Sequence, residues 1–378
     1  MRLINHSRMR AGYTTALRND GREWLVVVVK GSFSIPLPGE QWPTLAAKQA
    51  PLTETDVFTG EPGFSAPLYE NDFAPRKPRC DVLLNGSAYA PDGRPTTRVA
   101  VGIRLGAMTK TFDVVGHRHW KSRVLYASPS PPELFAQMPI SYNCAFGGID
   151  RAEHDPMKWR YYDTNHAGCG YHEHTAAEHL NGRPLPNTEE HGQSISSPTG
   201  NYPPLAFGPL GRAWKQRIGW AGTYDDRWLA QTAPFLPKDF DDRYYQCAPQ
   251  DQQIDYPVGG EPVDLLNLTP DGRNSFRLPA DLRQPVFIAL KSGEYQCVNA
   301  SVDTVLFEPD RRRFMLVWRA SLPLWRSLFE VEDVRVGVSH EQLGKQKAHQ
   351  VRMRSKRRFS SLADIVTLAH RRTSHEDA

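Results

Sequence analysis

The stretch Glu23 to Ile35 reads EWLVVVVKGSFSI and contains the longest aliphatic run of the chain, Leu25 to Val29. Clusters of valine favour the pleated geometry of a sheet, and an uninterrupted apolar run is typical of a strand buried on both faces. The run is far shorter than the roughly 20 residues that span a bilayer. It therefore predicts a long, mostly buried strand.

Further strand patterns lie on both sides of this run. Residues 80–90 lead into the turn Pro91-Asp92-Gly93-Arg94, and residues 97–105 then alternate between apolar and polar side chains, which predicts a hairpin over 80–105. Residues 109–115 are its expected partner strand. In the last third, with a turn at Pro309-Asp310, strands are predicted at 261–268, 286–291, 301–308, 313–320 and 331–338.

The middle of the chain, 117–260, is rich in proline, glycine and aromatic residues and has little periodic pattern. We expect ordered loops there, with short helices at 131–137 and at 225–231, the latter capped by Thr223. The predicted fold is mainly β: antiparallel sheets packed as in a β-sandwich, long aromatic- and Gly/Pro-rich insertions, and few short helices.

The predicted domain organisation is one large β-rich domain over residues 1–338, followed by a basic tail over 339–378. An alternative division has two interleaved sub-domains, in which the sheets come from 1–116 and 261–338 and residues 117–260 form an insertion. Gly and Pro, 28 and 31 residues, have no fixed period, so an internal repeat array is not indicated.

The net charge of +4 is a property of the tail. From Lys345 onward there are nine basic and three acidic residues, so the rest of the chain is nearly neutral. Within the tail, Leu362, Ile365 and Val366 follow a helical period, which predicts a short amphipathic helix that docks in a partner's groove. Nucleic-acid binding rests on this tail alone and is not the preferred interpretation.

The expected location is the cytoplasm. The N-terminal stretch MRLINHSRMR lacks the apolar segment of a signal peptide, and the five cysteines suggest no disulfide framework. No nucleotide-binding motif is present, and neither a cofactor nor a metal is expected.

Two stretches resemble catalytic sites. The first is SYNCAFGGID, 141–150, where Cys144 precedes two glycines, although no local charge stabilises its thiolate. The second is the set His154, His166, Cys169, His172, His174 and His179, whose spacing suits zinc in part. A metal-dependent or cysteine hydrolase built on the 154–179 histidines is one alternative. A structural loop with incidental histidines is the preferred interpretation.

Aromatic and acidic residues are concentrated at 220–228, WAGTYDDRW. The rings of this stretch either pack against the core or form a docking surface, because tryptophan and tyrosine carry much of the binding energy at protein interfaces. The residues assigned to partner binding under the second hypothesis are Trp220, Tyr224, Asp225 and Trp228.

Taken in order, several short motifs resemble those of the domain of unknown function 2169 family, which is found with bacterial type VI secretion clusters. The likeness spans roughly residues 1–334. The motifs are LINH (3–6), LVVVVK (25–30), DVFTGEPG (56–63), KPRCDV (77–82), GSAYAP (86–91), YNCAFGG (142–148), LPNTE (185–189), AGTYD (221–225), APQDQQ (248–253), GGEP (259–262), LVWR (316–319) and LPL (322–324).

The resemblance implies a structural signature rather than a catalytic set. Its residues are Tyr142, Phe146, Gly147, Gly148, Pro186, Asn187 and Glu189. Position 144 is not a required cysteine in the family pattern. The chain departs from the pattern at 165–170, where His166 stands in place of proline.

The resemblance also implies a function: a chaperone or adaptor, not an enzyme, that binds a toxin effector and helps to load it onto a secretion spike of VgrG-like and PAAR-type proteins. The partners expected from it are therefore proteins, and no insertion into a membrane is expected.

Overall fold

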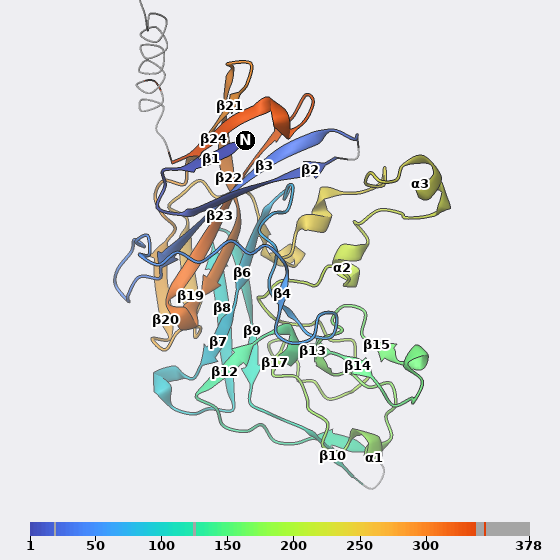
Figure 1. Cartoon of the computed structure of the whole chain (residues 1–378). Coiled ribbons are helices and arrows are strands. Elements are labelled where there is room, and N and C mark those ends of the chain that lie inside the picture. Colours follow the sequence, from blue (N-terminus) through green and yellow to red (C-terminus); the bar gives the residue numbers. More distant parts are fainter. Residues whose placement is uncertain (19, 124–125, 338–343, 345–378) are drawn as a thin grey trace, which may run out of the picture.

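The computed structural model describes residues 1–18, 20–123, 126–337 and 344. These residues form a mainly β protein in which two large sheets pack around one core (Figure 1). The predicted fold class is confirmed. The expectations for the tail, including those for Leu362, Ile365 and Val366, lie outside the described residues.

The larger sheet has nine strands. Seven of them follow one another in the order β1 (Arg2–Asn5), β24 (Val331–Val336), β21 (Gln284–Leu290), β22 (Tyr295–Glu308), β23 (Arg313–Pro323), β3 (Glu23–Ser34) and β2 (Arg10–Leu17). The other two are β6 (Cys80–Leu84), which pairs with the second half of β22, and β18 (Gln253–Ile254), which pairs with β6. Most of these pairs are antiparallel, but β1 with β24 and β6 with β22 are parallel.

Strand β3 lies between β2 and β23, and its valine run is buried on both faces, as predicted. Leu25, Val27 and Val29 belong to the main hydrophobic core. The side chains between them, Val26 and Val28, belong to a second cluster with residues from the loop that follows β3. Covering both faces explains why this strand has no polar alternation.

The smaller sheet has five antiparallel strands. Their order is β17 (Thr188–Glu189), β9 (Met108–Val115), β8 (Arg98–Leu105), β19 (Pro262–Leu266) and β20 (Arg273–Arg277). Phe276 of β20 meets two rings of the larger sheet, with 6.3 Å to the centroid of Phe307 and 5.8 Å to that of Phe314. The two sheets therefore share one core, as in a sandwich.

The remaining elements are short. Two-stranded sheets are formed by β4 (Val57–Phe58) with β5 (Pro67–Tyr69), β7 (Gly86–Tyr89) with β12 (Gln137–Ile140), β10 (Trp120–Ser122) with β11 (Ala127–Pro129), β13 (Phe146–Gly147) with β16 (Cys169–Gly170), and β14 (Ile149–Asp150) with β15 (Arg160–Tyr161). The described helices of the α type are α1 (Ala177–Leu180), α2 (Lys215–Ile218) and α3 (Asp226–Gln231). We call residues 117–201, which contain α1 and β13–β16, the lower lobe (Figure 1).

Two local predictions are wrong. The turn at residues 91–93 exists, but its flanking strands do not form a hairpin: β6 pairs with β22, β7 with β12, and β8 with β9. The predicted helix at 131–137 is extended chain leading into β12, and it begins with two prolines, which lack the amide donor of a helix. The hydrogen bonds of β6, of β7 and of the chain at Phe135 go to β22, to β12 and to Thr96, and the local sequence reveals none of these partners.

Candidate partner-docking surface

Residues 219–241 leave the body of the protein after α2 and return to it, and we call this segment the aromatic arm. It contains α3, which stands apart from both sheets in Figure 1. At the base of the arm, the amide of Asp241 donates to the carbonyl of Trp220 over 3.1 Å. The guanidinium of Arg243 lies 3.4 Å from the centroid of the Trp220 ring. These contacts hold the two ends of the arm together.

The tip of the arm is built around α3. The Tyr224 ring meets Trp228 edge-on, with 4.8 Å between centroids. The Trp228 indole nitrogen donates to the carbonyl of Phe235 over 2.9 Å, so the ring bridges α3 and the returning chain. Tyr224 is 54% exposed and Leu229 is 66% exposed, so an apolar surface faces solvent on a fixed support.

The cap of α3 differs from the prediction. The carboxylate of Asp225 accepts from the amide of Trp228 over 2.7 Å and so caps the helix, not Thr223. The Thr223 hydroxyl instead donates to Asp239 over 2.7 Å, and its amide donates to the same carboxylate over 3.0 Å. These two hydrogen bonds link the two sides of the arm.

The structure brings three of the four predicted docking residues together. Tyr224, Asp225 and Trp228 lie at the tip, whereas Trp220 lies at the base against Arg243. A shallow hollow of about 320 Å³ lies beside α3 and is lined in part by Lys238. Leu229, which is exposed at the tip, was not among the residues predicted from the sequence. Leu229 directly follows Trp228, so its side chain points to a different side of the helix.

The signature glycines lie in the lower lobe at points of close backbone approach. Gly147 and Gly148 have φ values of +147° and +113°. A Cβ on Gly147 would lie 2.2 Å from the carbonyl oxygen of Asn165, and one on Gly148 would lie 2.6 Å from that of Gly168. No other residue type fits these positions without moving the backbone.

The other signature residues are buried. Tyr142 meets Trp214 edge-on, with 5.2 Å between ring centroids, in the main core, and Phe146 is enclosed in the lower lobe.

The signature residues near β17 contact the smaller sheet. Pro186 and Asn187 precede β17, and the side-chain amide nitrogen of Asn187 donates to the carbonyl of Val115 over 3.0 Å. Glu189 is buried and forms ion pairs of 2.5 Å with Arg98 and 2.6 Å with Arg118. The contacts of Asn187 with Val115 and of Glu189 with Arg98 join the middle of the chain to the smaller sheet.

Cys144 does not have the surroundings of an activated nucleophile. It is partly buried, and this burial raises the pKa of its thiol. A raised pKa favours the neutral thiol over the nucleophilic thiolate.

The predicted histidine set is divided by the fold. His166 packs against Tyr161, with 5.7 Å between ring centroids, and Cys169 pairs within β16. His172, His174 and His179 instead gather around the buried carboxylate of Asp150. Burial raises the pKa of Asp150, but hydrogen bonds from His174 and two further backbone amides outweigh this effect and lower it to about 2.

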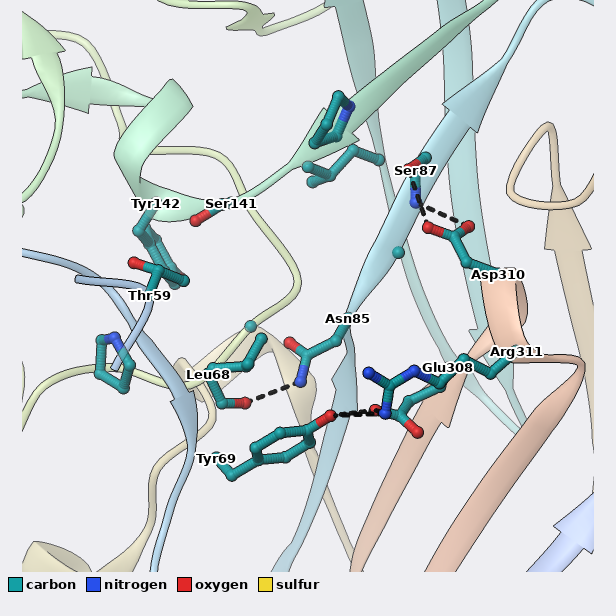
Figure 2. Close-up of a pocket in the computed structure, with 15 residues that line it drawn as sticks. Thr59, Leu68, Tyr69, Asn85, Ser87, Ser141, Tyr142, Glu308, Asp310 and Arg311 are labelled. Atoms are coloured by element: carbon teal, nitrogen blue, oxygen red, sulfur yellow. Dashed lines mark hydrogen bonds and ion pairs between the residues drawn. The ribbon is translucent and has the colours of Figure 1, made fainter. Parts of the chain in front are cut away.

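A second hollow, of about 330 Å³, lies between β7 and the turn after β22 (Figure 2). Its polar side chains bond to one another: Ser87 donates to Asp310 over 2.8 Å, and the Tyr69 hydroxyl donates to Glu308. Burial and then the Glu308 carboxylate raise the pKa of Tyr69 to about 12. The groups that line this hollow thus act as cross-links between strands. From the sequence, only the turn at Pro309-Asp310 was predicted here.

The fold and site define a class: a two-sheet β protein that carries a projecting arm with exposed aromatic rings. A family model described as "Uncharacterized protein conserved in bacteria (DUF2169)" matches residues 20–319, most of the chain. The protein belongs to this family. No curated protein and no solved structure matches the chain. Among the described residues, no helix has the length and apolarity to cross a membrane.

Proposed function

We propose that this protein is a cytoplasmic adaptor that binds a toxin effector of a type VI secretion system and helps to load it onto the VgrG-like and PAAR-type spike. The proposal combines the family to which the chain belongs with the surface that the arm presents. It requires protein–protein contact and no covalent step.

The observation that carries the proposal is the geometry of the arm. Tyr224 and Leu229 expose apolar surface, while the Asp225 cap, the Trp228 indole bond and the Thr223–Asp239 pair fix the support beneath them. A rigid aromatic anchor loses little conformational entropy on binding, and such anchors dominate interface energetics. The arm therefore has the form of a preorganised docking element.

The distribution of charge favours a protein partner over nucleic acid. Outside the tail the acidic and basic residues nearly balance, and many arginines are engaged in ion pairs, for example Arg98 with Asp113 and Arg104 with Asp264. A surface that binds the phosphate backbone needs an excess of unpaired cations.

The test uses the arm variant Tyr224→Ala/Leu229→Ala, which leaves the Trp228 indole bond and the helix cap in place. We expect the dissociation constant for the cognate effector, measured by titration calorimetry, to rise at least tenfold, because two exposed anchors are truncated. The matched control is Trp325→Ala/Phe329→Ala, which removes two side chains that are 81% and 83% exposed on the segment after β23.

The control variant should bind within twofold of the wild type. Circular dichroism and the melting temperature establish that both variants are folded. Wild-type affinity in a folded arm variant would contradict the role of the arm. Co-purification with spike proteins from the native cell tests the loading step separately.

A further inference from the structure

Three potential metal ligands converge in the lower lobe from separate parts of the chain. Asp150 ends β14, His172 follows β16, and His179 lies in α1. One ligand atom from each of the three lies within 4.8 Å of the other two. This grouping replaces the spacing His166-x-x-Cys169-x-x-His172 that the sequence suggested.

The distances suit a shared ion better than direct hydrogen bonds. The Nε2 atom of His179 lies 3.8 Å from Oδ1 of Asp150, which is too long for a hydrogen bond. Two ligands of one tetrahedral zinc ion, each about 2.0–2.1 Å from the metal, lie about 3.3–3.5 Å apart. A small inward movement would bring both atoms to that separation.

The carboxylate is oriented so that one oxygen stays available. Oδ2 of Asp150 accepts three hydrogen bonds of 2.9 Å, from the amides of Glu173 and His174 and from Nδ1 of His174. Oδ1 accepts only the amide of Ala152, over 3.0 Å, and it is the oxygen nearer His179. His174 therefore positions the carboxylate, as partners of metal-ligating groups commonly do.

An unsatisfied nitrogen lies in the same group. Nδ1 of His172 is buried and has no hydrogen-bond partner among the residues that the structure describes. A buried polar atom without a partner is destabilising, so such atoms call for a specific explanation. A bound cation would accept the lone pair of this nitrogen.

We propose that Asp150, His172 and His179 bind a zinc ion that stabilises the lower lobe. Two imidazoles and one carboxylate are a donor set that zinc accepts, whereas calcium and magnesium prefer oxygen ligands alone. The inference is independent of the adaptor function, and it departs from the expectation that these histidines are incidental.

The lobe gives such an ion a structural role. Within the described part of the chain, its separate hydrophobic cluster has five buried residues: Trp120, Phe146, Leu180, Leu185 and Ile195. Helix α1 has four residues, too few for stability without tertiary support. Zinc would join α1 to β14 and to the segment after β16, and metal binding at such a site adds directly to folding stability.

The test uses the full-length chain, free of any histidine tag, stripped with a chelator and titrated with zinc chloride against a chromophoric competitor. We expect one equivalent to bind, and cobalt to give the visible absorption of a four-coordinate site. His179→Ala, whose side chain is 28% exposed, should weaken zinc at least 100-fold, and His174→Ala should weaken it about 10- to 100-fold.

The matched control is His166→Ala, a neighbouring histidine outside the group, which should bind zinc as the wild type does. Zinc should raise the melting temperature of the wild type and of the control, but not that of His179→Ala. Calcium and magnesium should leave the melting temperature of all three proteins unchanged. Binding of less than about a tenth of an equivalent would overturn the proposal. So would wild-type zinc affinity in both His179→Ala and His172→Gln; the second variant covers the case in which the first does not fold.

Discussion

At the scale of single residues, the most deeply buried ion pair joins Lys77 to Asp81, with 2.8 Å between Nζ and Oδ2. The Lys77 ammonium also contacts the hydroxyl of Thr304 over 3.1 Å, and Asp81 accepts from the side chain of Gln246 over 2.6 Å and from the amide of Cys247 over 2.9 Å. Burial lowers the pKa of Lys77, but the charge of Asp81 outweighs this effect and raises it. The raised pKa keeps the Lys77 ammonium charged inside the protein.

Removing one partner of this pair should be more damaging than removing both. Lys77→Met or Asp81→Asn alone leaves a buried unpaired charge or a disrupted network, and we expect each to lower the free energy of unfolding by about 3–5 kcal/mol. The double variant should lose less than the sum of the two, with a coupling energy of about 1–3 kcal/mol. Urea unfolding of all four proteins measures this.

The solvent-exposed pair Asp281–Arg283, with 2.7 Å between its charged atoms, supplies the control. The same pair of substitutions there should leave the unfolding curve unchanged. Additive losses at Lys77 and Asp81 would show that the two side chains do not act as a unit.

Sequence reasoning marked 77–82 as a motif but gave no cause for it. The partners of this pair come from 246–248 and from Thr304, far along the chain, so no local pattern reveals them. The signature glycines were easier, because a double glycine already indicates backbone angles that a side chain would forbid.

At the scale of elements, α3 depends on its cap. The helix has six residues, too few for stability by propensity alone, and Asp225 satisfies one of its free amides. The orientation of Trp228, and hence the shape of the arm, follows from this helix.

Asp225→Ala should destabilise α3 locally by about 1 kcal/mol. Hydrogen exchange at the amides of Leu229 and Thr232, which donate to carbonyls within the helix, should then become about fivefold faster while the melting temperature of the body stays constant. Asp226→Ala, which removes a first-turn charge but no cap, is the control and should change exchange far less. Equal exchange in Asp225→Ala and the wild type would contradict the capping role.

Strands with long apolar runs were predicted well. Strands β3, β21, β23 and β24 lie where the pattern placed them, because their buried faces leave a clear signal over several residues. For β22 the prediction covered the buried half from Ser301 and missed the start at Tyr295, where burial is incomplete. The two-residue strands of the lower lobe carry no periodicity at all. Turn chemistry alone misled the prediction at 80–105, since a good turn does not specify which strands pair across it.

At the scale of the whole molecule, salt-bridged loops tie the sheets to the middle of the chain. Asp56, in the loop after β3, pairs with Arg212 over 2.6 Å, and both Arg212 and Arg217 reach Glu70, over 3.0 Å and 2.6 Å. The density of rings pointed to the arm, but its projection from the body could not be predicted, because it depends on where these distant contacts anchor the chain.

The ion pair between Asp56 and Arg212 makes the free energy of unfolding depend on pH. Burial raises the pKa of Asp56, but the hydrogen bond from Arg212, that from the amide of Asn71, and the charges of Arg212 and Arg217 outweigh this effect and bring the pKa below its usual value. A lowered folded-state pKa means that this contribution is complete well above the unfolded-state pKa, from about pH 5 upward, and is lost as the pH falls through the folded-state value. Urea unfolding at pH 7, 5 and 3.5 should therefore show a smaller loss in Asp56→Asn than in the wild type.

Asp255, which pairs with Arg79 but is 94% exposed, provides the control for this experiment. Asp255→Asn should follow the wild-type pH dependence. An identical loss of stability in Asp56→Asn and the wild type would show that Asp56 does not contribute to acid sensitivity.

The pairing of β3 with β23 has a consequence for synthesis on the ribosome. Ser34 is bonded opposite Arg313, so the valine-rich strand emerges long before its neighbour has been translated. At about 5–20 residues per second, this interval is on the order of 15–60 s. During that time the β23 edge of the run has no partner, and β2 and the loop after β3 are the segments already available to cover it, so we expect nascent chains on one messenger to associate through this open edge.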